Sequence, residues 1–119
     1  MQTILAIDDQ PGIRRLLEEI FKGTDYKIIT VAGGRDALKY LQQQKPELVL
    51  LDVKMPGLDG IEVLRELTAL YPGLPVIMMT AYGELQVIDE AIDLGARGYI
   101  TKPFDIMELR RLVESILNP

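Results

Sequence analysis

The stretch LVLLDVKMPG, residues 48–57, decides the fold of this chain. Four apolar residues run directly into Asp52, and Pro56 and Gly57 mark a turn soon after it. An unbroken apolar run of this length is typical of a strand covered on both faces, as in a parallel sheet. Asp52 therefore ends a buried strand, at the edge where open α/β sheets bind ligands. Because a buried carboxylate is unstable without a partner, the sequence predicts a cation or hydrogen-bond donors beside it.

Strands and helices alternate on both sides of this stretch. Strands are predicted over residues 3–7, 26–31, 47–52, 75–79 and 97–101. Each is followed by apolar residues at helical spacing, such as Ile88 with Ile92 and Ile106 with Leu109. Five alternations predict a (βα)5, doubly wound parallel five-stranded sheet. The expected strand order is 2-1-3-4-5, which is flavodoxin-like.

The composition narrows the possible classes of protein. The 119 residues are expected to form one domain, residues 1–119, and they include no histidine and no cysteine. Histidine metal sites, histidine bases and thiol chemistry are therefore excluded. The net charge of -5 argues against a nucleic-acid surface. With no apolar segment of membrane-spanning length and no signal peptide, we expect a cytoplasmic protein without a membrane partner.

Chemically complementary residues follow four of the predicted strands. They are Asp8 and Asp9 after the first strand, Asp52 after the third, Thr80 after the fourth and Lys102 after the fifth. Oxygen ligands without histidine or cysteine favour a hard ion, Mg²⁺ or alternatively Mn²⁺. We expect Asp9 and Asp52 to bind it directly and Asp8 to act through water. A metal, a hydroxyl, an ammonium and a carboxylate nucleophile suit phosphoryl transfer, so the sequence predicts an aspartyl phosphate at Asp52.

Each of these residues also has a simpler interpretation. Asp8 and Asp9 could cap the helix that begins near Pro11, and Asp52 could be a loop carboxylate. Thr80 could be structural, and Lys102 could lie in a solvated turn. Their shared place at one sheet edge favours the active-site interpretation for the set.

With these motifs, the chain resembles the receiver domains of two-component response regulators. The resemblance covers nearly the whole chain and rests on Asp8-Asp9, on LDVKMPGLDG at 51–60, on MTAY at 79–82 and on Lys102-Pro103-Phe104. Within the family the chain is similar to single-domain regulators of sporulation phosphorelays, through the shared runs GIR at 12–14, TAYGEL at 80–85 and KPFDI at 102–106. It departs from them at Tyr99, where they carry histidine, and at Pro11, where they carry an aromatic residue.

The resemblance implies a role for each matching residue. Asp52 would accept a phosphoryl group from a phosphohistidine, with Asp9, Asp52 and the backbone carbonyl of Lys54 binding Mg²⁺ and Asp8 holding a metal water. Thr80 and Lys102 would ligate the phosphoryl oxygens. Such a protein catalyses its own phosphorylation and slow dephosphorylation rather than conventional turnover.

The resemblance also implies a conformational switch and partners. Thr80 and Tyr99 would turn inward together on phosphorylation, although Tyr99 could instead be an ordinary residue on an exposed sheet edge. The Lys102–Pro103 peptide would be cis. We expect a monomer that docks a sensor histidine kinase or histidine phosphotransferase; dimerisation on phosphorylation is left open. The predicted docking residues ring the site: Gln10, Pro11, Ile13, Leu16, Tyr82, Pro103 and Phe104.

Three other functions stay open at this stage. A dehalogenase-type phosphatase also uses Asp, Mg²⁺, Thr and Lys, but its two aspartates lie one residue apart after a single strand. The chain could also be the receiver part of a longer DNA-binding regulator. A third alternative is an interaction module whose site is idle, against which the complete residue set argues.

Overall fold

The computed structural model of the chain describes residues 1–55, 58–81 and 85–119. Its strands are β1 Gln2–Ile7, β2 Tyr26–Val31, β3 Leu48–Asp52, β4 Lys54–Met55, β5 Leu58–Asp59, β6 Val76–Ala81 and β7 Gly98–Lys102. Its helices are α1 Pro11–Phe21, α2 Gly34–Gln43, α3 Gly60–Leu70, α4 Leu85–Asp93 and α5 Ile106–Leu117. No helix in these described parts is long and apolar enough to cross a membrane.

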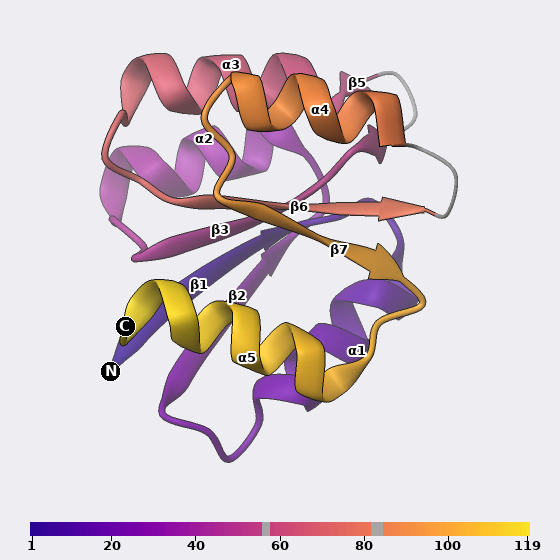
Figure 1. The fold of residues 1–119 in the computed structure, drawn as a ribbon. Helices are drawn as coiled ribbons and strands as arrows, with labels where there is room; N and C mark the ends of the chain where they lie inside the picture. Colours follow the sequence, from indigo (N-terminus) through magenta and orange to yellow (C-terminus); the bar gives the residue numbers. More distant parts are fainter. Residues whose placement is uncertain (56–57, 82–84) are drawn as a thin grey trace.

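Five parallel strands form the main sheet in the order β2-β1-β3-β6-β7 (Figure 1). Numbered among themselves, these strands follow the predicted 2-1-3-4-5 order, which is confirmed. The order reverses between β1 and β3, so the two strands that end beside Asp8 and at Asp52 are neighbours. This reversal point is where open α/β sheets bind their ligands.

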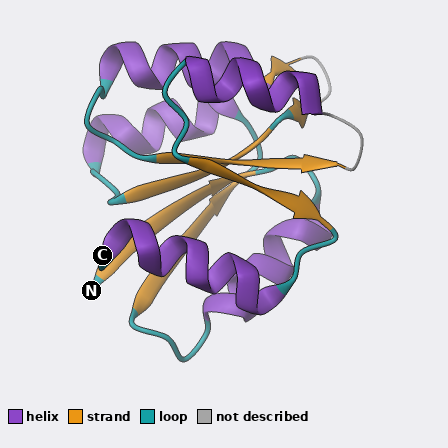
Figure 2. Cartoon of the chain, in the orientation of Figure 1, coloured by secondary structure: helices purple, strands orange, loops and turns teal. Residues whose placement is uncertain are grey.

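Helices cover both faces of the sheet, with α2, α3 and α4 on one side and α1 and α5 on the other (Figures 1 and 2). Successive side chains of each strand alternate between these two faces. In β3, for example, Val49 and Leu51 pack in the α2–α3–α4 layer, whereas Leu48 and Leu50 pack in the α1–α5 layer. All four are fully buried, which explains why the strand reads as a continuous apolar run.

The turn after Asp52 contains a feature that the sequence analysis did not predict. Lys54–Met55 and Leu58–Asp59 pair as a small antiparallel hairpin, where we expected a loop. Asp59 then caps α3 by accepting a hydrogen bond from the Ile61 N–H at 2.9 Å. Gly60 lies so close to β3 that a Cβ added there would be 2.3 Å from the Asp52 carbonyl oxygen. The hairpin and the start of α3 therefore pack directly against the strand end that carries Asp52.

Several predicted details were wrong. The strands at 75–79 and 97–101 are displaced, so Thr80 lies inside β6 and Lys102 inside β7. Ile92 and Ile106, expected on buried helical stripes, are each 44% exposed. Ile106 opens α5 before the turn that packs on the sheet, where Leu109 is the first buried residue. Ile92 lies in the last turn of α4, next to the buried Ala91.

Candidate functional site

The predicted site lies where β1, β3 and β7 end, on the side of the sheet covered by α1 and α5. Ile7 and Leu51 belong to the opposite layer, so the next residues, Asp8 and Asp52, point toward α1 and α5. Ile100 packs in the α1–α5 layer, and Lys102, two residues later, points to the same side. Strand alternation therefore brings together side chains that are far apart in the sequence.

Three carboxylates form the centre of this site. One oxygen from each of Asp8, Asp9 and Asp52 lies within 4.8 Å of the other two. Asp8 is fully buried and Asp52 is 5% exposed, while Asp9 is partly exposed. Such oxygen ligands, with an opening to solvent at Asp9, suit a hard divalent cation that keeps several waters. The residues present therefore fit a magnesium ion.

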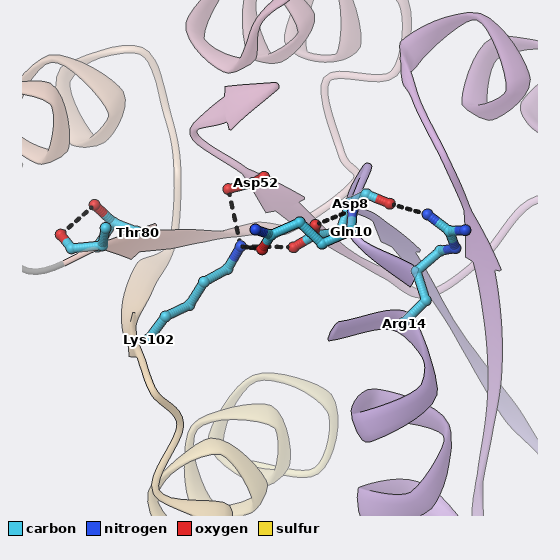
Figure 3. A network of polar contacts seen from close by, with 7 residues as sticks. Asp8, Gln10, Arg14, Asp52, Thr80 and Lys102 are labelled. Carbon is cyan, nitrogen blue, oxygen red and sulfur yellow. Dashed lines mark hydrogen bonds and ion pairs between the residues drawn. The ribbon is translucent and has the colours of Figure 1, made fainter. Parts of the chain in front are cut away.

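Lys102 supplies the positive charge that the carboxylates require. Its Nζ donates to Asp8 Oδ2 at 2.8 Å, lies 3.3 Å from Asp52 Oδ1 and is 3.4 Å from Gln10 Oε1 (Figure 3). The side chain of Lys102 is only 16% exposed, so its ion pairs with Asp8 and Asp52 are shielded from solvent. Its interpretation as a residue of a solvated turn is therefore wrong.

The surroundings of Asp52 shift the pKa of its carboxyl group. The pKa of Asp52 is raised from 3.8 to about 6, chiefly by burial and then by the neighbouring charge of Asp8. The Lys102 ammonium and a backbone hydrogen bond from Lys54 act in the opposite direction. Burial dominates because Asp8 already occupies the shorter of the two contacts with Lys102. A cation bound here would favour the ionised carboxylate.

Thr80 lies near the end of β6, next to β3, but among the described residues it makes no hydrogen bond to this polar network. Its side chain is buried, and its hydroxyl donates to the Ala81 carbonyl at 3.2 Å, turned away from Asp52 (Figure 3). Met79 packs in the α1–α5 layer, so alternation places Thr80 on the other side. Tyr99 is 43% exposed. The inward turn of Thr80 and Tyr99 on phosphorylation stays a prediction.

The predicted docking residues that the structure describes differ in exposure. Gln10, Pro11 and Pro103 are exposed, and Ile13 and Phe104 are partly buried against the α1–α5 layer. Leu16 is 38% exposed, whereas Ile20 and Phe21 are in the core, as expected. Tyr82 lies outside the described residues. The Lys102–Pro103 peptide is cis, which confirms that prediction.

Arg14 is the residue that the sequence analysis did not assign to the site. Its guanidinium donates to the carbonyl oxygen of Asp8 at 2.8 Å (Figure 3). The available signal was an arginine one turn into the helix that follows an acidic pair. Helical residues also point back toward the preceding turn, which would have directed it there.

The comparisons with known proteins identify the class. Residues 4–114 match the response regulator receiver domain family. The chain therefore belongs to this family, the phosphoacceptor modules of two-component and phosphorelay signalling, which bind Mg²⁺ in an acidic pocket. This membership disfavours the dehalogenase-type alternative.

Among individual proteins, the chain is 47% identical over 116 residues to sporulation initiation phosphotransferase F of Bacillus subtilis. The match covers 98% of the chain and 94% of that relative. It is 39% identical to the regulatory protein AtoC of Escherichia coli, across 99% of the chain but only 26% of AtoC. The crystal structure of the NtrX receiver domain from Brucella abortus has a TM-score of 0.92 at 34% identity, covering 96% of this chain and 97% of that one.

Proposed function

We propose that Asp52 is the phosphoacceptor of this receiver domain and that residues 1–119 act as a single unit. The observation that carries the proposal is the buried Asp52 carboxylate, 3.3 Å from the Lys102 ammonium and clustered with Asp8 and Asp9. Asp8 and Asp9 share this pocket, but Asp8 is already held by Lys102 and by the Gln10 N–H. Asp52 is therefore the carboxylate best placed to react.

The reaction follows from these positions. An Asp52 oxygen attacks the phosphorus of a partner's phosphohistidine, the P–N bond breaks as the new O–P bond forms, and the histidine nitrogen leaves with the electron pair. Asp9, Asp52 and the backbone carbonyl of Lys54 would hold Mg²⁺ (or Mn²⁺), with Asp8 holding a metal water. A divalent cation held there would neutralise charge that develops on the phosphoryl oxygens. Lys102 then exchanges its contact with Asp52 for a phosphoryl oxygen.

The proposal is tested by mixing the protein with Mg²⁺ and phosphoramidate and measuring its intact mass. We expect one phosphoryl adduct that persists for many minutes and that Asp52→Asn abolishes. Repeated turnover of the donor without an adduct would support a phosphatase instead. Absence of both adduct and turnover would support an interaction module with an idle site.

We further propose that the phosphoryl donor is a histidine-bearing helical bundle, as in a histidine phosphotransferase or a sensor histidine kinase. The chain has no histidine of its own, so the phosphohistidine must come from a partner. Similarity to a sporulation phosphotransferase supports a relay, and the match to AtoC keeps a longer DNA-binding regulator as an alternative. The cytoplasm and a monomeric state stay predictions.

The docking residues make the partner proposal testable. Ile13 lies on α1 at the opening of the site and is only partly buried, so it is available to a partner. We expect Ile13→Ala to slow transfer from a phosphorylated histidine phosphotransferase while leaving phosphorylation by phosphoramidate unchanged. Ile116→Ala is the matched control, because Ile116 is also partly buried in the α1–α5 layer but lies in the last turn of α5. Equal transfer rates for the two variants would contradict docking through Ile13.

A further inference from the structure

The turn formed by Asp8 and Asp9 at the end of β1 is held by hydrogen bonds to the N–H, the carboxylate and the carbonyl oxygen of Asp8. The Asp8 N–H donates to the Val31 carbonyl of β2 at 3.1 Å. Its carboxylate accepts hydrogen bonds from the Gln10 N–H at 2.9 Å and from Lys102 at 2.8 Å. Its carbonyl oxygen accepts from Arg14 Nη1 at 2.8 Å. Every polar group of Asp8 is therefore fixed.

Arg14 is the charged side chain among these partners that binds the backbone of Asp8 and not its carboxylate. The neighbouring acidic side chains would be the ordinary partners of an arginine. Instead, its guanidinium reaches back from the first turn of α1 to the peptide group that joins Asp8 to Asp9 (Figure 3). A charged donor on this carbonyl restricts rotation of that peptide, and hence the direction of the Asp9 side chain that follows it.

The start of α1 supports this interpretation. Gln10 occupies the N-cap position, where Ser, Thr, Asp or Asn is strongly favoured, and its side chain makes no capping hydrogen bond. Its Oε1 instead lies 3.4 Å from Lys102 Nζ. Pro11 favours the start of the helix, but the Gln10 side chain contacts the site and does not cap the helix, which is typical of a functional position.

We propose that Arg14 is a positioning residue, which fixes the Asp8–Asp9 turn so that Asp9 and Asp52 present their oxygens to one divalent cation. The inference rests on the proposed magnesium site and concerns a residue that would not touch the metal. Residues that orient metal ligands in this way typically account for a 10- to 100-fold change in metal affinity. We expect loss of the Arg14 contact to weaken Mg²⁺ binding about tenfold.

The sign of the effect separates positioning from simple electrostatics. Removing a positive charge close to an acidic site strengthens the attraction of that site for a cation. If a variant lacks the charge of Arg14 but binds Mg²⁺ more weakly, the cause is therefore a change in the positions of the carboxylate ligands. Arg15 provides the matched control because it is the next residue of α1, carries the same charge and is exposed.

The test measures divalent-ion binding directly, without phosphorylation. Dissociation constants for Mg²⁺ are obtained by calorimetry, and for Mn²⁺ from the free-ion signal in electron paramagnetic resonance, for wild type, Arg14→Gln, Arg14→Lys and Arg15→Gln. We expect about tenfold weaker binding in Arg14→Gln. We expect partial recovery in Arg14→Lys, which keeps one charged donor, and affinity equal to or above wild type in Arg15→Gln. Urea unfolding without metal reports separately any loss of general stability.

Each result decides between the proposals. Unchanged or tighter binding in Arg14→Gln would overturn the positioning role while leaving the magnesium site intact. Absence of binding in wild type would overturn the magnesium site and, with it, this inference. If Arg14→Gln does not fold, the comparison of Arg14→Lys with wild type, which carries the same charge, decides: Mg²⁺ binding in Arg14→Lys as tight as in wild type would overturn the role.

Discussion

At the scale of single residues, Asp52 combines a cost to stability with a chemical use. Its carboxylate is buried beside Asp8, and the single ammonium of Lys102 contacts both. Ionising Asp52 in the folded, metal-free protein therefore works against burial and like charge. A cation bound at this site would relieve this cost, since it would give the charge of Asp52 a partner.

This cost predicts how stability depends on pH. With a pKa of 3.8 unfolded and about 6 folded, Asp52 binds more protons in the folded state between these values. Its contribution to stability is therefore complete below about pH 4 and is lost as the pH rises through about 6. We expect Asp52→Asn to raise the free energy of unfolding by about 2–3 kcal/mol at pH 7 without metal.

Urea unfolding with chelator present, from pH 4 to pH 8, measures this effect. The difference in free energy of unfolding between Asp52→Asn and wild type isolates Asp52, because other titrating groups are common to both. We expect the difference to grow between pH 4 and pH 6 and then to level off. A difference that stays constant with pH, or that favours wild type at pH 7, would contradict the account.

At the scale of elements, the start of α3 constrains the position of the strand end that carries Asp52. Gly60 packs against backbone atoms, with a built Cβ 2.3 Å from the Asp52 oxygen, 2.6 Å from the Val53 oxygen and 2.8 Å from Val53 Cα. None of these atoms is the flexible end of a side chain. Asp59 caps the helix within its own segment, but the close approach of Gly60 to β3 joins two elements and could not be read from the sequence.

We expect Gly60→Ala to destabilise the protein by about 1–3 kcal/mol or more, because the strand end must move. Gly12→Ala is the control: no atom lies within 4 Å of its built Cβ, and alanine is the better helix former. In thermal unfolding, we expect the melting temperature to fall in Gly60→Ala and to rise in Gly12→Ala. A Gly60→Ala protein as stable as wild type would show that this contact is not constraining.

The elements also show what the sequence could predict. The lengths of the apolar runs and the spacing of apolar residues between them predicted all five strands of the main sheet and their order. These strands could be predicted because buried parallel strands form continuous apolar runs in a sequence. The hairpin β4–β5 was missed because two-residue strands carry no period. The sequence analysis did not assign Thr80 to a face of the sheet, and the alternation along β6 places it opposite Asp52 and Lys102.

At the scale of the whole molecule, the two sides of the sheet carry different parts of the proposed function. The carboxylates and Lys102 lie on the α1–α5 side, and the Thr80 hydroxyl lies on the α2–α3–α4 side of the same edge. For Thr80 to ligate a phosphoryl group on Asp52, it must exchange its bond to Ala81 for one across the sheet edge. Such a shift alters the surface of α4, β7 and α5, where Tyr99 is exposed.

We therefore expect phosphorylation to change hydrogen exchange in α4, β7 and α5, and to reduce the exposure of Tyr99. Mass spectrometry of the protein with and without Mg²⁺ and phosphoramidate measures both effects. Thr80→Ala should still be phosphorylated but show a smaller change, since the hydroxyl that responds to the phosphoryl group is absent. An undiminished change in Thr80→Ala would contradict a switch through this residue.

The identity of the phosphorylated residue tests the central claim most directly. After reaction with Mg²⁺ and phosphoramidate, borohydride reduces an aspartyl phosphate to homoserine, and peptide mass mapping locates the altered residue among Asp8, Asp9, Asp52 and Asp59. We predict conversion of Asp52 alone, lost when Mg²⁺ is chelated. Conversion of any other aspartate, or an adduct that persists in Asp52→Asn, would contradict the claim.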